Sequence, residues 1–247
     1  MNVLLDLGNS RCKFAVLGGS VPEVYGALPY SESKRLVVVE SVLRQYSGPD
    51  RILVCSVLGH NLREQLVQLF MSHQVEDCLF LDCSSADRFG IRLGYRNPGE
   101  LGADRLAAMI AANAKYHGNT CIVDCGTAVT VDALGTGGIH HGGVIFPGLM
   151  SMRTALAADT SIDFDEETDS FEVAPDSTRG AIYTGCLSAV AGGIERVVRT
   201  MQDRYGSFDQ VILTGGDAKL LEPLLTCKTV HEPYLVLDGL KHVSKAV

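Results

Sequence analysis

Three polar turns, each after a strand-like apolar run, hold residues that can bind a phosphate chain. Residues 6–9 read Asp-Leu-Gly-Asn, residues 124–127 read Asp-Cys-Gly-Thr, and residues 214–217 read Thr-Gly-Gly-Asp. Glycine lets the backbone approach a ligand closely, and bare N–H groups beside short polar side chains suit phosphate oxygens. An aspartate at a strand end can hold a metal ion or its water. The first turn alone is more typical of a plain hairpin, and it matches neither a Walker loop nor a dinucleotide site.

A fourth candidate is the pair Asp104 and Arg105, which follows the turn-forming residues 97–99. A carboxylate within hydrogen-bond reach of a hydroxyl can accept its proton, and a guanidinium offers a fixed positive fork to an anion. The other interpretation is that both residues only cap and solvate the alanine-rich helix that begins here. The spacing alone leaves the two interpretations open.

The elements that must position these residues alternate between strand and helix patterns. The sequence predicts a hairpin over residues 1–17 and a single long helix or two helices over 177–205. It also predicts helices at 31–46, 61–72, 100–116 and 150–158, and strands at 51–57, 78–82, 120–124, 129–134 and 209–213, with a further strand through Ile145. Such alternation predicts parallel sheets flanked by helices, which place ligands at the carboxyl ends of their strands.

The polar turn at residues 6–9 recurs at residues 124–127, each time after a strand and before a second strand. A repeated strand and turn of the same design indicates a duplicated domain. We therefore expect two domains, residues 1–114 and 115–247.

Composition excludes several classes of function. The chain has 247 residues, of which 46% are hydrophobic and 20% charged, and its formal net charge is -8. These values are typical of a packed globular protein, and without a run of Lys and Arg they argue against nucleic acid or an anionic membrane as the main partner. No apolar run approaches the roughly 20 residues that span a bilayer. We expect a cytoplasmic protein.

Other candidate ligands give weaker signals. The eight cysteines are scattered and form no Cys-x-x-Cys pair, so they are expected to be free thiols in the core. Cys121 and Cys125 are the only two cysteines whose positions suggest a metal site. Their spacing lacks the partner ligands that a zinc site requires, so a role in core packing is the preferred interpretation. Eight carboxylates within residues 159–176 match no calcium loop and favour a solvated loop. His140 and His141 are adjacent on a strand and should point to opposite faces.

The three turns, taken in order, resemble those of the actin-like ATPase and sugar kinase superfamily. Residues 97–105, Asn-Pro-Gly-Glu-Leu-Gly-Ala-Asp-Arg, together with the Gly-Gly-x-Ile-x-Pro-Gly pattern at 142–148, resemble type III pantothenate kinases, over nearly the whole chain. The resemblance implies two duplicated actin-like (ribonuclease H-like) domains, each with a mixed sheet flanked by helices, and an ATP cleft between them.

The resemblance also implies the reaction and its residues. ATP with Mg²⁺ phosphorylates pantothenate to 4'-phosphopantothenate, the first step of coenzyme A biosynthesis, in a homodimer. Asp104 is the implied general base, and Asp124 the implied ligand of a monovalent cation, K⁺ or NH₄⁺. The implied ATP contacts are Asp6, Leu7, Gly8, Asn9, Ser10, Arg11, Cys12, Lys13 and Thr127. The implied pantothenate contacts are Tyr95, Gly102, Ala103, Asp104, Arg105 and Thr178.

Two other functions are weighed against this one. A kinase of another small alcohol, such as a sugar, would usually carry a sugar-binding Asn-Asp pair or a zinc-binding cysteine cluster, and neither pattern is present. A non-catalytic ATP-binding regulator or accessory factor would be favoured by loss of Asp104 or Thr127, and both residues are present.

Overall fold

The computed structural model describes residues 1–18, 23–46, 48–75, 77–159 and 171–246. The chain forms two compact units. Unit 1 contains Met1–Lys115, Gly137–Ile139 and Tyr234–Val247, and unit 2 contains Tyr116–Thr136 and His140–Pro233. The expected domain division between residues 114 and 115 stays a prediction. The C-terminal segment, which that division assigns to the second domain, belongs to unit 1.

The sheet of unit 1 has five strands in the order β3-β2-β1-β4-β5. β1 pairs antiparallel with β2 and parallel with β4, so the sheet is mixed rather than purely parallel. Residues 3–5 of β1 are fully buried, as expected for a central strand covered on both faces. The strands are β1 (Asn2–Leu7), β2 (Arg11–Leu17), β3 (Val24–Pro29), β4 (Arg51–Ser56) and β5 (Asp77–Phe80).

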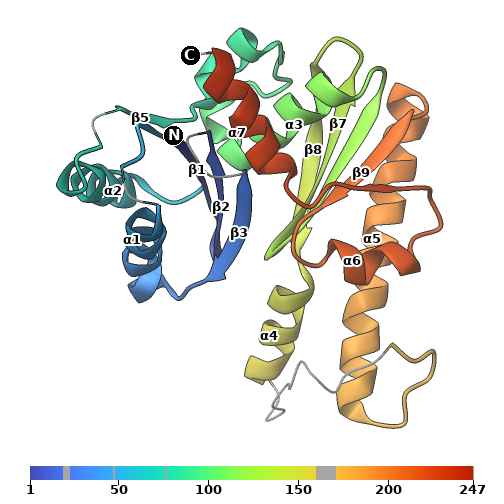
Figure 1. The fold of residues 1–247 in the computed structure, drawn as a ribbon. Coiled ribbons are helices and arrows are strands. Elements are labelled where there is room, and N and C mark those ends of the chain that lie inside the picture. Colours follow the sequence, from blue (N-terminus) through green and yellow to red (C-terminus); the bar gives the residue numbers. More distant parts are fainter. Residues whose placement is uncertain (19–22, 47, 76, 160–170, 247) are drawn as a thin grey trace. The chain divides into compact units, whose positions relative to one another are not determined.

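Helices cover both faces of this sheet (Figure 1). On one face, α1 (Arg35–Gln45) and α2 (His60–Ser72) pack Val42, Leu66 and Phe70 against alternate residues of β1 and β4. On the other face lie α3 (Ala103–Lys115) and α7 (Leu235–Ala246). A Cβ at Gly239 of α7 would come within 3.0 Å of the Ala107 backbone, so glycine permits the close crossing of these two helices.

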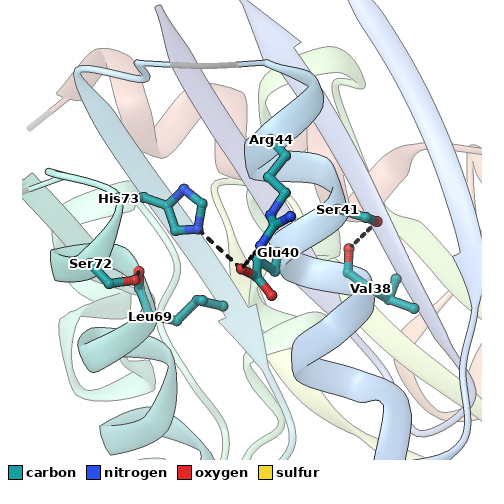
Figure 2. A network of polar contacts seen from close by, with 7 residues as sticks. All are labelled: Val38, Glu40, Ser41, Arg44, Leu69, Ser72 and His73. Carbon is teal, nitrogen blue, oxygen red and sulfur yellow. Dashed lines mark hydrogen bonds and ion pairs between the residues drawn. The ribbon is translucent and has the colours of Figure 1, made fainter.

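A surface network joins α1 to the end of α2 (Figure 2). Glu40 Oε1 accepts a hydrogen bond from Arg44 Nη2 at 2.7 Å and lies 3.7 Å from His73 Nε2. The hydrogen bond from Arg44 lowers the pKa of the Glu40 carboxyl. Because these groups are exposed or partly exposed, the network contributes little to the stability of the fold.

The sheet of unit 2 repeats the design, with the strand order β10-β9-β6-β7-β8. β6 pairs antiparallel with β7 and parallel with β9, as β1 does with β2 and β4. The strands are β6 (Thr120–Cys125), β7 (Ala128–Gly135), β8 (Ile139–Pro147), β9 (Gln210–Thr214) and β10 (Val230–His231). The two sheets therefore begin with the same hairpin, as the repeated turn predicts.

The α-helices in the described part of unit 2 are α4 (Leu149–Asp159), α5 (Thr178–Tyr205) and α6 (Ala218–Leu221). Ser177 caps α5 by accepting a hydrogen bond from the Gly180 N–H at 3.1 Å. Val190 and Ile194 of α5 are buried in one core with Val123 of β6. Within this unit, α4 and the N-terminal half of α5 extend beyond the end of the sheet (Figure 1).

Most elements predicted from the sequence are confirmed, and residues 177–205 form one helix rather than two. β3 and α7 have no counterpart among the predicted elements. His140 is buried and its Nε2 lies 2.9 Å from Asp132 Oδ1, whereas the exposed His141 stacks on Tyr205, so these two histidines do point to opposite faces. Residues 160–170 of the predicted acidic loop lie outside the described residues. None of the described helices is long and apolar enough to cross a membrane.

Candidate active site

The first polar turn joins β1 to β2. Asp6 pairs with Lys13 across the two strands, and Lys13 Nζ lies 3.9 Å from Asp6 Oδ2. The Gly8 N–H closes the turn on the Arg11 carbonyl at 3.2 Å, and the tip, Asn9 and Ser10, is exposed. The turn thus presents short polar side chains to solvent next to a carboxylate and an ammonium group.

Two of the predicted ATP contacts, Leu7 and Cys12, have side chains that are fully buried in the core of unit 1. Burial, with a smaller effect of the Asp6 charge, raises the pKa of the Cys12 thiol to about 12. Only the backbone of these two residues is available to a ligand at the turn.

The predicted base, Asp104, lies in the first turn of α3. Its Oδ1 accepts a hydrogen bond from the Arg105 N–H at 2.7 Å. A Cβ on Gly102 would lie less than 3.0 Å from that same oxygen and 3.6 Å from Val57 Cγ1, just beyond β4. The carboxylate therefore occupies the space that a side chain at position 102 would fill, and a larger residue there would displace it.

One buried thiol connects the first turn with the predicted base. Cys55 on β4 is fully buried and lies opposite Asp6 in the parallel register. Its pKa is raised well above the ordinary value, mainly by burial, and further by the charges of Asp6 and Asp104. Both carboxylates thus act on the same thiol, so unit 1 brings the predicted base and the first polar turn into one neighbourhood.

Tyr95 and Arg105 form a pair beside Asp104. Arg105 is 5% exposed, its Nη1 donates to the Tyr95 hydroxyl at 2.7 Å, and its Cζ lies 5.4 Å from the centre of the Tyr95 ring. The sequence predicts that Arg105 offers a positive fork to the polar end of the substrate or to the phosphate, and the family resemblance implies a direct contact with pantothenate. Its burial and its bond to Tyr95 give it a second role, which is to fix the orientation of the tyrosine ring.

The second polar turn, in unit 2, joins β6 to β7 and is held by hydrogen bonds from the start of α4 and the residue before it. The carbonyl of Thr127 accepts hydrogen bonds from the Gly148 N–H at 3.0 Å and from Ser151 Oγ at 2.6 Å. A Cβ on Gly148 would lie within 3.0 Å of backbone atoms of this turn. The glycine of the 142–148 pattern thus lets α4 begin against the turn, and the Thr127 side chain stays exposed.

Backbone and carboxylate oxygens converge at the third turn. A Cβ on Gly215, whose φ is +95°, would lie less than 3.0 Å from both Asp124 Oδ1 and the Cys125 carbonyl oxygen. Thr214 pairs with Asp124 in the parallel register, and its buried Oγ1 has no hydrogen-bond partner among the described residues. Burial and the charges of Asp124 and Asp217 raise the pKa of the Cys125 thiol, so this thiol stays neutral.

This oxygen set fits a weakly held monovalent cation better than a structural metal. Carbonyl oxygens replace the hydration shell of such cations, and one carboxylate supplies the charge. Among the residues that the structure describes, no group of three or more His, Cys, Asp or Glu side chains is arranged to hold a metal ion. Cys121 and Cys125, the tempting pair, are both buried free thiols in the apolar core of unit 2, which agrees with their packing role.

Thr178, the first residue of α5, lines an apolar cavity of about 700 Å³ between α4 and α5. Ser151, which donates to the Thr127 carbonyl, lines the same cavity. The predicted substrate contact Thr178 and the second polar turn are thus linked through α4 within unit 2.

The predicted site residues fall into two groups. Residues 6–13, Tyr95 and residues 102–105 belong to unit 1, and Asp124, Thr127 and Thr178 belong to unit 2. Sequence reasoning missed the neutral thiol of Cys55 and the packing of Gly215 against Asp124. Neither has a local sequence signal, because each depends on residues far apart in the chain.

The family model and the curated relatives that match this chain carry the same family description. Residues 2–200 match the family described as type III pantothenate kinase. A protein of that name from Nitrosococcus oceani is 36% identical, and the match covers 99% of this chain and 94% of the relative.

Solved structures agree with the fold. A Baf family protein from Campylobacter jejuni aligns with a TM-score of 0.61 at 21% identity, covering 98% of this chain and 97% of that one. MreB5 of Spiroplasma citri, bound to AMPPNP, aligns with a TM-score of 0.54 at 11% identity, covering 99% and 96%. At such low identity these likenesses show the fold alone. The predicted actin-like fold is confirmed.

Proposed function

This chain belongs to the type III pantothenate kinase family, whose reaction is the ATP-dependent phosphorylation of pantothenate in coenzyme A biosynthesis, and we propose that Asp104 is its general base. The observation that carries the proposal is the position of Asp104 in unit 1. Its carboxylate lies next to Gly102 at the start of α3. Its charge, like that of Asp6 in the first turn, acts on the buried thiol of Cys55.

Phosphoryl transfer needs orientation and charge neutralisation more than covalent help from the protein. The oxygen of the primary hydroxyl of pantothenate forms a bond to the γ-phosphorus, and the bond from that phosphorus to the bridging oxygen of ADP breaks. The hydroxyl proton passes to the Asp104 carboxylate as the new bond forms. The products are 4'-phosphopantothenate and ADP.

ATP contacts are assigned to residues 6–13 and to Thr127. The exposed Asn9 and Ser10 and the nearby Lys13 ammonium support this assignment, because they offer donors and positive charge to phosphate oxygens. Enzymes of this kinase family use ATP with Mg²⁺, which neutralises charge on the phosphates. Asp6, at the carboxyl end of β1, is the residue suited to hold that ion or one of its waters.

The proposed monovalent cation, K⁺ or NH₄⁺, is assigned to Asp124. Support comes from the carboxylate and carbonyl oxygens that converge over Gly215. A bound cation here would hold the start of the second turn and the third turn together. We infer that its removal lowers activity by loosening the ATP site.

The pantothenate contacts are assigned to Tyr95, residues 102–105 and Thr178. Support comes from the Tyr95 hydroxyl, which Arg105 fixes beside the base. Hydroxyl, amide and carboxylate groups of pantothenate offer matching hydrogen-bond partners.

We also propose a homodimer in the cytoplasm. Met150 and Leu156 of α4 are 45% and 41% exposed, and the adjoining cavity between α4 and α5 is apolar, so a second copy could cover this face. Light scattering should give twice the 26.5 kDa mass of one chain, and a mass near 26.5 kDa would contradict the dimer. All eight cysteines are free thiols, which supports a reducing compartment.

A direct assay tests the function. Purified protein is given ATP, Mg²⁺ and pantothenate, with and without K⁺ or NH₄⁺, and 4'-phosphopantothenate is measured by mass spectrometry. If 4'-phosphopantothenate forms, and forms faster with K⁺ or NH₄⁺, the result supports both the kinase activity and the need for a monovalent cation. Phosphorylation of another alcohol but not of pantothenate would favour the kinase alternative, and ATP binding without turnover would favour the regulator.

A further inference from the structure

Tyr30, the residue that follows β3, holds the first polar turn through two hydrogen bonds. Its backbone N–H donates to the Ser10 carbonyl at 3.0 Å, and its hydroxyl donates to the Gly8 carbonyl. Both acceptors belong to residues 8–10, the three residues that join β1 to β2, and the tip of this turn is exposed. One residue, 22 positions from Gly8, therefore fixes the back of the turn at two points.

The surroundings of Tyr30 make it rigid. The side chain is 9% exposed and lies in the core of unit 1 with Val39 and Val42 of α1. The Arg35 Cζ lies 5.3 Å from the centre of the Tyr30 ring, so the guanidinium also packs against this ring. Because a carbonyl oxygen can only accept, the hydroxyl proton of Tyr30 is directed to Gly8.

The hydroxyl keeps that proton over the whole physiological range. Burial raises the pKa of Tyr30 to about 12, although the Arg35 charge opposes the shift. Ionisation of the hydroxyl therefore does not remove the bond to Gly8 at physiological pH.

Holding the Gly8 carbonyl also fixes the next N–H. The peptide group is planar and trans, so the Gly8 carbonyl and the Asn9 N–H point in opposite directions. With the carbonyl held by Tyr30, the Asn9 N–H is directed away from Tyr30. A backbone N–H presented in this way is the kind of group that binds phosphate oxygens in polar turns.

We propose that Tyr30 is a positioning residue for ATP binding. Its two hydrogen bonds order residues 8–10 before ATP arrives, so that the turn is ready to bind the phosphates. The inference rests on the proposed role of residues 6–13 in ATP binding. A turn that is ordered before the ligand arrives loses less conformational entropy on binding, so the loss of Tyr30's hydroxyl should appear as weaker ATP binding.

The test is Tyr30→Phe, which keeps the ring and its packing and removes only the hydroxyl. One hydrogen bond of ordinary net strength corresponds to a rise in KM for ATP of about threefold to tenfold. The KM for pantothenate should stay within twofold of the wild-type value. The dissociation constant of adenosine, which has no phosphate, should stay unchanged while that of ATP rises.

Two further variants make the result decisive. Tyr46→Phe is the matched control, because among the described residues the Tyr46 hydroxyl accepts a hydrogen bond from Gln45 Nε2 at 3.3 Å, at a solvent-exposed position of unit 1. Asn9→Asp places a negative charge at the exposed tip and tests the proposed ATP role of the turn itself. Thermal unfolding without nucleotide is measured for all variants.

The outcomes separate the two claims. If Asn9→Asp raises the KM for ATP and Tyr30→Phe raises it selectively, the positioning role is supported. If Asn9→Asp raises it and Tyr30→Phe does not, or if Tyr30→Phe weakens ATP, adenosine and pantothenate alike, the positioning role is overturned. If Asn9→Asp has no effect, the ATP role of the turn is wrong, and the positioning role is overturned with it.

Discussion

The carboxylate of Asp104 lies against the Cα of Gly102, where any side chain at position 102 would displace it. A general base must lie within hydrogen-bond reach of the proton it accepts, so its position matters as much as its pKa. In this protein the absence of a side chain two residues earlier sets that position, and the hydrogen bond from the Arg105 N–H holds it.

Gly102→Ala should therefore lower kcat sharply. The new Cβ would overlap Asp104 Oδ1, and a displacement of about 1 Å at a reacting group costs on the order of 100-fold in rate. The KM for ATP should hardly change. The matched control is Gly99→Ala, where the nearest atom to a Cβ is Asn97 Oδ1 at an ordinary 3.5 Å. Steady-state kinetics that give equal kcat values for both variants would contradict the role of Gly102.

Tyr95→Phe should weaken pantothenate and leave ATP unaffected. The change removes the hydroxyl that Arg105 holds at 2.7 Å and leaves that buried guanidinium one acceptor short. Hydrogen bonds to charged groups are worth enough to raise the KM for pantothenate about tenfold. Tyr205→Phe, whose ring stacks on His141 in unit 2, should have no effect. Initial rates measured at varied pantothenate concentrations test this prediction. A change in the KM for ATP alone would count against Tyr95 as a pantothenate contact.

Gly215→Ala should raise the concentration of K⁺ or NH₄⁺ needed for activity. A Cβ there would push against Asp124 Oδ1 and the Cys125 carbonyl, and the φ of +95° would be strained. A loss of about 1.4 kcal/mol in cation binding corresponds to a tenfold higher half-activating concentration. Gly192→Ala on α5, which has open space at its Cβ, is the control. Identical cation titrations for the two variants would remove the support for Asp124 as the ligand.

Alkaline pH should destabilise unit 1 through Cys12. The folded state raises the pKa of this thiol from its ordinary value of 9.0 to about 12, so the folded protein keeps a proton that the unfolded chain loses. Stability is then fully present below pH 9 and falls as pH rises toward 12, by about 1.4 kcal/mol per pH unit for one such thiol. Urea unfolding between pH 8 and pH 11 should show a shallower decline for Cys12→Ala. Parallel declines for the two proteins would contradict this.

Much of the fold could be predicted because its signals are local. Residues 6–9 and 124–127 each follow an apolar run with a short polar turn, and these patterns place both hairpins. β3 escaped prediction because Gly26 and Pro29 are disfavoured in strands. A Cβ on Gly26 would overlap the Phe14 ring, so this glycine is required by packing against β2, which no local pattern reveals.

The candidate site was predictable only in part. Asp104 carries its signal in the neighbouring residues 97–105, and its assignment depends on a resemblance over that segment. Tyr30, Cys55 and Gly215 act on residues that are distant in sequence, and their roles appear only when the chain is folded. Arg105 illustrates the same limit, since its sequence indicates an anion-binding fork while its burial adds a structural bond to Tyr95.

Asp104→Asn is the most direct test of the proposed general base. Asparagine keeps the size of the side chain and an oxygen that can accept from the Arg105 N–H, but it cannot take a proton from the pantothenate hydroxyl. With ATP, Mg²⁺ and K⁺ or NH₄⁺ at saturation, kcat for 4'-phosphopantothenate formation should fall about 100-fold to 10,000-fold while ATP affinity is retained. Turnover within a few-fold of the wild-type rate would contradict the account.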